Sequence, residues 1–190
     1  NQGTSTASII AAGWSTSSPP TTSEAEEYNE SINTITPAAW SSSGNLSTGR
    51  YALGGTGTQT AALAVSGQTS PGTYTPSTEE YGGASWTSGG AVGTARYTMA
   101  AGGTQTAAII SMGFVSTAAI TTTEYYNGTS WTSGTSSNDN RTNLGSGGTQ
   151  TAFLSTGGLS GNPAYTQYSC VEEYDGSSWS TSTAFPSTVH

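Results

Sequence analysis

The chain has 190 residues, of which 32% are hydrophobic and only 7% charged, while serine and threonine together make up about a third. Its three arginines, absence of lysine and formal net charge of −8 leave no basic stripe for a phosphate backbone, so nucleic acid is not an expected partner. Its sequence has no run of about eighteen apolar residues, which argues against insertion of a helix into a membrane.

Internal repetition is the strongest signal in the sequence. A unit of about 46 residues is present in four copies, with approximate limits 1–49, 50–95, 96–140 and 141–190. We therefore expect one repeat domain over residues 1–190. The regular spacing of the aromatic residues indicates a packed fold rather than disorder. The repeat is marked by Trp40, Trp86, Trp131 and Trp179, and by Arg50, Arg96 and Arg141, each of which follows a tryptophan by ten residues.

Each unit continues with a short apolar run that ends near a glycine. The clearest runs cover residues 60–65, 106–110 and 151–154, and the glycines are Gly67, Gly113 and Gly158. Short apolar runs flanked by threonine are typical of buried strands.

The next segment of the unit differs in every copy and covers residues 14–23, 68–78, 114–123 and 159–171. Variable connections on a constant scaffold are where recognition is usually located. Four aromatic residues in these segments, Trp14, Tyr74, Tyr165 and Tyr168, are candidates for stacking on sugars, although they could equally cover strand edges.

A glutamate-containing segment that ends in tyrosine then leads to the tryptophan. The tyrosines are Tyr28, Tyr81, Tyr126 and Tyr174. In the last three copies the tryptophan follows the tyrosine by five residues, and the dipeptides directly after the tyrosine, 82–83, 127–128 and 175–176, predict two-residue type I′ hairpin turns. In the first copy the hairpin is longer and adds residues 29–37 on one face.

No window shows a sustained helical period, so an all-β protein with one four-stranded sheet per unit is expected. The series Arg50, Gly67, Tyr81 and Trp86, and its counterpart Arg96, Gly113, Tyr126 and Trp131, resemble kelch repeats. This resemblance implies a kelch-like β-propeller of four blades. Similar Gly/Thr-rich repeat arrays occur in structural proteins of bacteriophages.

The ends of the chain suggest how such a ring would close. The position that arginine holds in the repeat is Val189 after the last tryptophan, and for the first copy it would lie upstream of Asn1. We therefore expect the C-terminal segment to supply the first strand of the first sheet, which would hide the edge strands. Four whole repeats also fit a slice of a longer array, which is the alternative.

The charged residues point to a scaffold. Each arginine is expected to meet carboxylate or carbonyl oxygens at a junction between units, with a ligand-binding ring of arginines as the alternative. The glutamates lie on strands, so one of each pair would meet an arginine while its neighbour faces solvent. No metal-ligand spacing is present, and neither a metal nor a cofactor is expected.

Catalysis is not expected either. The one histidine, His190, is at the terminus, and Cys170 has no histidine near it in the sequence. Carboxylate pairs recur with the repeat, which favours a scaffold over an active site.

Two classes of function remain. The first is a non-catalytic structural or adhesive module of an extracellular appendage, fibre or virion surface, with copies of itself or other surface proteins as partners. The second is a soluble carbohydrate- or protein-binding module that uses the variable loops of one face. An extracellular or virion location would also allow N-glycosylation, for which the candidate sites are Asn29, Asn45, Asn127 and Asn140.

Overall fold

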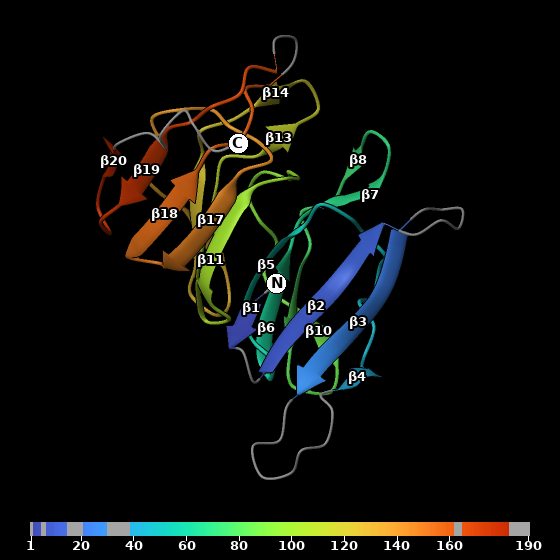
Figure 1. Cartoon of the computed structure of the whole chain (residues 1–190). Helices are drawn as coiled ribbons and strands as arrows, with labels where there is room; N and C mark the ends of the chain where they lie inside the picture. Colours follow the sequence, from blue (N-terminus) through green and yellow to red (C-terminus); the bar gives the residue numbers. More distant parts are fainter. Residues whose placement is uncertain (1, 5–6, 15–20, 30–38, 162–164, 183–190) are drawn as a thin grey trace.

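The computed structural model describes residues 2–4, 7–14, 21–29, 39–161 and 165–182, and up to residue 40 it describes the backbone alone. All regular elements of these residues are β-strands, which confirms the all-β class (Figure 1). None of the described residues belongs to a helix long and apolar enough to cross a membrane.

Four antiparallel sheets of four strands follow one another along the chain, one for each predicted repeat. The first sheet contains β1 (Gln2–Thr4), β2 (Ala7–Trp14), β3 (Thr21–Asn29) and β4 (Ala39–Ser42). The second contains β5 (Gly54–Thr58), β6 (Ala61–Val65), β9 (Thr78–Tyr81) and β10 (Trp86–Ser88). The third contains β11 (Ala100–Thr104), β12 (Ala107–Ser111), β15 (Thr123–Tyr126) and β16 (Trp131–Ser133). The fourth contains β17 (Gly145–Thr149), β18 (Ala152–Thr156), β19 (Val171–Tyr174) and β20 (Trp179–Ser182).

The variable segments connect the second and third strands of each sheet. In the second sheet this connection forms the small hairpin β7 (Gln68–Ser70) and β8 (Thr73–Tyr74), and in the third it forms β13 (Phe114–Val115) and β14 (Ala118–Ala119). Both hairpins lie at the same end of the molecule, at the top of Figure 1. We call this end the variable face.

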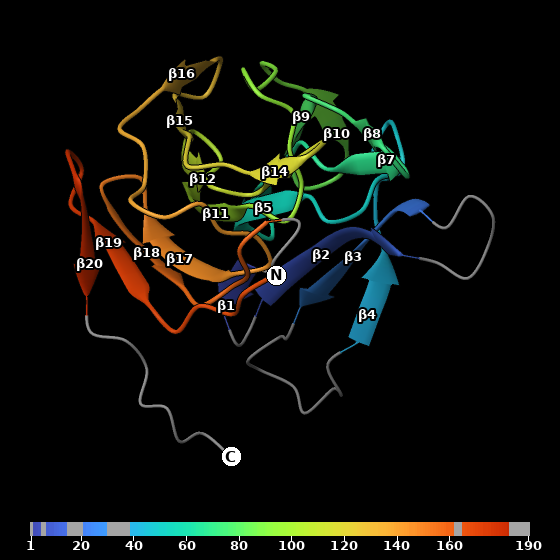
Figure 2. The same cartoon turned by 90° about the horizontal axis from the view of Figure 1, so that it is seen from above.

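The sheets pack through their faces, with their first strands innermost. Strand β5 lies along β11, β11 lies along β17, and β1 lies beside β5. Figure 2 shows these first strands toward the middle of the molecule and the last strands toward its outside. Leu63 and Val65 of β6 pack with Ile110 of β12, and in the next junction Ile109 packs with Phe153 of β18. Each interior junction therefore has its own apolar layer, which stabilises the array.

Two Gly-Thr-Gln-Thr segments, at residues 103–106 and 148–151, link the third and fourth sheets to the sheet before each of them. The side-chain amide of Gln105 donates to the carbonyl oxygens of Ala62 and Tyr81, at 3.1 and 2.7 Å. Gln150 reaches back in the same way to Ala108 and Tyr126. These bonds satisfy carbonyl groups at a point where two sheets meet.

The expectation that the C-terminal segment supplies the first strand of the first sheet was wrong. Residues 2–4 form β1 and pair with β2, so the first sheet has its own inner strand. The reason is that the repeat position of the arginine does not lie in a strand of any sheet. Arg50 precedes β5 in a connection whose next residue, Tyr51, makes only an isolated bridge to Gln68. Val189 lies outside the described residues.

The predicted hairpins are present, but their turns differ from type I′. Tyr81 pairs with Trp86, and the equivalent residues pair in the third and fourth sheets. A positive φ occurs only at the second residue of each dipeptide, at +87° in Gly83. In the third sheet the side-chain oxygen of Asn127 accepts hydrogen bonds from the backbone amides of residues 129 and 130. This local capping holds the turn without a left-handed conformation at Asn127.

Candidate functional site

The three arginines are fully buried and are held by oxygen atoms of their own repeats. The Arg96 Nη2 donates to Glu124 Oε1 at 2.6 Å, and its Nη1 donates to the carbonyl oxygens of Thr122 and Met112 at 2.7 and 3.1 Å. Arg50 makes an equivalent ion pair with Glu79 at 2.9 Å. Because these side chains are fully buried and paired with carboxylate or carbonyl oxygens, they serve the scaffold and do not form a ring open to ligands.

The backbone of the same arginines joins neighbouring repeats. The carbonyl oxygen of Arg96 accepts hydrogen bonds from the backbone amide of Gly67, at 2.9 Å, and from the Ser66 hydroxyl, at 2.8 Å. The carbonyl oxygen of Arg141 likewise accepts from Gly113 at 2.8 Å. Arg96 and Arg141 therefore each hold their side chain in one repeat and join their backbone to the repeat before it.

The glutamates are divided between two environments. The second carboxylate oxygen of Glu124 accepts a hydrogen bond from the Gly93 amide at 2.6 Å, which ties down the segment before Arg96. Its counterparts in the second and fourth sheets, Glu79 and Glu172, are also buried. By contrast, Glu173 is exposed. The three buried glutamates therefore lie in separate repeats, each beside the arginine of its own repeat.

The ion pair of the fourth sheet is longer than the other two. Arg141 Nη2 lies 3.5 Å from Glu172 Oε2 and donates instead to the Ser155 hydroxyl at 2.9 Å. The buried Glu172 Oε2 accepts no hydrogen bond. Burial raises the pKa of Glu172, and the Arg141 charge and the Asp139 amide oppose this rise only in part.

The raised pKa of Glu172 predicts how the free energy of unfolding depends on pH. Because the folded state holds this proton more tightly than the unfolded chain, the contribution of Glu172 to stability should fall as pH rises from 4.5 through its folded pKa. Carboxyl ¹³C NMR should therefore give a pKa above 4.5 for Glu172, and Glu172→Gln should flatten this part of the pH dependence of the unfolding free energy. Glu173→Gln is the matched control and should leave it unchanged. A Glu172 pKa at or below 4.5 would refute the prediction.

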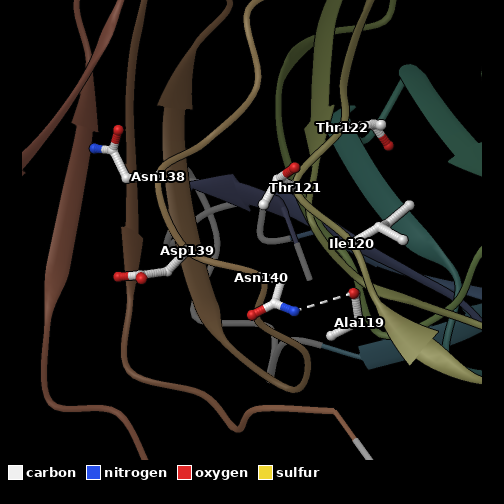
Figure 3. A pocket seen from close by; sticks show the side chains of 7 residues that line it. All are labelled: Ala119, Ile120, Thr121, Thr122, Asn138, Asp139 and Asn140. Carbon is white, nitrogen blue, oxygen red and sulfur yellow. Dashed lines mark hydrogen bonds between the residues drawn. The ribbon is translucent and has the colours of Figure 1, made fainter.

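A polar hollow of about 330 Å³ lies on the surface of the third repeat (Figure 3). Residues 119–122 and 138–140 line it, and the Asn140 side-chain amide donates across it to the carbonyl oxygen of Ala119 at 3.4 Å. Beside it, the Cys170 thiol is 3.6 Å from the Asp139 carboxylate, and burial raises the pKa of the thiol. A protonated thiol is a poor nucleophile. Among the described residues, no group of three or more acidic, histidine or cysteine side chains is placed to hold a metal ion.

The tyrosine and tryptophan rings of the second, third and fourth repeats pack together. Their ring centroids lie 4.9 to 5.3 Å apart in the second, third and fourth sheets. Trp131 Nε1 donates to the Thr78 hydroxyl of the preceding sheet at 2.9 Å, and Trp179 Nε1 donates to the carbonyl oxygen of Thr135 at 3.0 Å. In the first sheet Tyr28 and Trp40 are paired in register, and their side chains lie outside the described part.

The predicted ligand residues have different surroundings. The Tyr74 ring stacks on Tyr97, with centroids 5.3 Å apart, while Tyr165 is 54% exposed. Tyr168 is half-buried, and its backbone amide donates a hydrogen bond to the carbonyl oxygen of Gly158. The side chain of Trp14 lies outside the described part of the chain.

Sequence reasoning missed three aromatic residues on the variable face. They are Tyr51, Tyr97 and Phe114. The signal was present for two of them, because each tyrosine directly follows an arginine of the repeat.

Of the candidate glycosylation sites, Asn45, Asn127 and Asn140 are exposed. Asn29 pairs through its backbone with β2 and β4. The side chain of Asn29 lies outside the described part of the chain, and all four sites stay predictions.

The comparisons with known proteins support the fold alone. No family model and no curated protein sequence matches the chain. Solved structures do match it, in 140 chains, and the structure of YjhT is one of them, with a TM-score of 0.67 and 13% sequence identity. The match covers 86% of this chain and 53% of YjhT, so this chain spans about half the length of that structure.

Proposed function

We propose that this chain is a non-catalytic structural or adhesive module of an extracellular appendage, fibre or virion surface. In this proposal it is a kelch-like propeller array of four blades that packs against copies of itself. The repeated polar residues support a scaffold role, because they are used within and between the sheets. The low charge and the richness in serine and threonine suit an exposed surface protein.

The propeller assignment has two supports. The sheets have the strand order of propeller blades, each with its first strand toward the middle of the molecule. Three buried Arg–Glu pairs and three Tyr–Trp pairs then recur in the phase that resembles kelch repeats.

An uncovered face of the fourth sheet carries the proposal of self-assembly. Leu63, Ile109 and Leu154 occupy the same place in the second strands of their sheets. Leu63 and Ile109 are 1% and 0% exposed because the next sheet covers them, whereas Leu154 is 39% exposed. The surface that fits here is the covering face of another sheet of this kind, which a second copy of the chain would supply.

Mutation of Leu154 tests this assembly. The wild-type chain should form oligomers or regular arrays in sedimentation and electron microscopy, and Leu154→Asp should weaken the association at least tenfold, because it places a charge in an apolar contact. Thr132→Asp, at an exposed position of β16, is the control and should assemble normally. A 19.1 kDa monomer at every concentration, or assembly unaffected by Leu154→Asp, would argue against the proposal.

A second candidate function is binding of carbohydrate or protein by the variable loops. One observation favours it, namely the gathering of tyrosine side chains from three repeats on the variable face. An adhesive module and a binding module would share this surface. They differ in whether the chain also assembles through its fourth sheet.

A further inference from the structure

The variable face carries a group of aromatic residues, which we call the tyrosine cluster. It consists of Tyr51, Tyr74, Tyr97, Phe114 and Tyr165. Tyr51 and Tyr74 belong to the second repeat, Tyr97 and Phe114 to the third, and Tyr165 to the fourth. Residues more than a hundred positions apart are thus brought together by the stacking of the sheets.

Rigid backbone bridges hold the inner part of the cluster. Tyr97 and Phe114 exchange two backbone hydrogen bonds, at 3.1 and 2.9 Å, and Tyr51 makes the same exchange with Gln68 at 3.0 and 2.9 Å. Each tyrosine also directly follows a fully buried arginine. The positions of Tyr51 and Tyr97 are therefore fixed by the scaffold, as a preformed binding site requires.

The rings form a connected series rather than a buried core. Tyr74 and Tyr97 are nearly parallel, with 16° between the ring planes, and Phe114 meets Tyr97 edge to face at 5.6 Å. The phenols of Tyr74, Tyr165 and Tyr51 lie near that of Tyr97, whose pKa is raised by burial first and by these neighbours next. Apart from Phe114, the rings keep part of their surface in solvent, and Tyr165 is 54% exposed at a φ of +44°. A strained backbone that presents an aromatic ring to solvent is more typical of a binding loop than of a core.

The charges around the cluster restrict the class of ligand. All three arginines of the chain are fully buried in other contacts, and there is no lysine, so no arginine or lysine is free to meet an anion. Glutamates of the described repeats lie on the sheet strands, not within this cluster. A ligand of this surface would be uncharged, would have a flat apolar face for the rings and would have hydroxyl groups for the phenols.

The geometry points to a neutral oligosaccharide as the ligand of the tyrosine cluster. Sugar rings would stack through their C–H faces on Tyr74 and Tyr165, while phenol groups exchange hydrogen bonds with sugar hydroxyls. This inference rests on the proposed function only in placing recognition on the variable face. It does not depend on assembly through Leu154.

Glycan binding by the full chain tests the inference. The chain should bind neutral glycans on an array that also carries sialylated and sulfated ones, and calorimetry with the best neutral glycan should give the affinity. Tyr74→Ala and Tyr165→Ala should each weaken binding at least about fivefold, because each removes a stacking surface worth about 1 kcal/mol. Tyr74→Phe should keep most of the affinity, since it preserves the ring.

Thr132→Ala, at an exposed position of β16 and outside the tyrosine cluster, is the control and should bind normally. Thermal melts would show that each variant is folded. Absence of binding to neutral glycans, binding to anionic glycans only, or binding unchanged in both alanine variants would overturn the inference. Sedimentation of the same samples separates the two proposals: assembly without glycan binding contradicts only the ligand, and glycan binding by a permanent monomer contradicts only the self-assembling module.

Discussion

Replacement of Glu124 by alanine should lower the free energy of unfolding by about 3 to 5 kcal/mol. Arg96 is fully buried and loses its 2.6 Å ion pair in this variant, so an uncompensated guanidinium charge would remain in the interior. Glu124 also accepts hydrogen bonds from the amides of Gly93 and Thr94, which would be left without that partner. The loss should therefore be much larger than for an exposed ion pair.

Urea denaturation of the variants measures this effect. Glu173→Ala removes an exposed glutamate from the same type of strand and should change stability by no more than about 0.5 kcal/mol. Glu172→Ala should cost less than Glu124→Ala, because the ion pair with Arg141 is longer at 3.5 Å. If Glu124→Ala cost less than about 1 kcal/mol, the buried pair would not be the support that its geometry implies.

The scaffold could be predicted from the sequence because its chemistry repeats. A single arginine or tryptophan would say little, but three or four of each in one phase indicate that equivalent residues meet equivalent partners. The pairing of Arg96 with Glu124 and of Tyr126 with Trp131 follows this logic. Their positions are set by contacts within one repeat or between adjacent repeats.

The features that sequence reasoning missed depend on departures from the repeat. The turn after Tyr126 is decided by the hydrogen bonds of the Asn127 side chain, which a dipeptide preference does not reveal. The tyrosine cluster joins segments of unlike sequence, and its members are adjacent only after the sheets have stacked. The exposure of Leu154 also cannot be read locally, because the residue has the same phase and character as Leu63 and Ile109.

The repeated residues and the variable residues therefore have different roles in the molecule. The glutamines, the arginines and the Tyr–Trp pairs make their contacts inside the array. Because equivalent residues make equivalent contacts, they hold the units in the same way. The connections of the variable face join these repeated contacts only near their ends, where carbonyl oxygens of Ser77, Thr122 and Cys170 accept hydrogen bonds from the arginines, and the residues between those ends differ from repeat to repeat. This division explains how a chain with few charged and apolar residues can hold four sheets and still present a distinct surface.

Replacement of Gly103 by alanine should destabilise the chain by more than about 3 kcal/mol. Gly103 lies near the end of β11 with a φ of +95°, and a Cβ there would be 2.2 Å from the carbonyl oxygen of Ala107 on the paired strand. Backbone cannot rotate away as a side chain can, so the β11–β12 hairpin would have to open. Strand β11 lies between β5 and β17, and its displacement would loosen two sheet junctions.

Gly72→Ala separates this steric effect from the cost of the left-handed conformation. Gly72 also has a positive φ, +79°, but no atom lies within 4 Å of the position that its Cβ would occupy. Its replacement should cost only about 1 to 2 kcal/mol, from backbone strain. Thermal and urea denaturation, together with the soluble yield, should therefore rank wild type above Gly72→Ala and Gly72→Ala well above Gly103→Ala. Equal losses in the two variants would mean that conformational strain alone, and not the close approach of the two strands, makes glycine necessary in this segment.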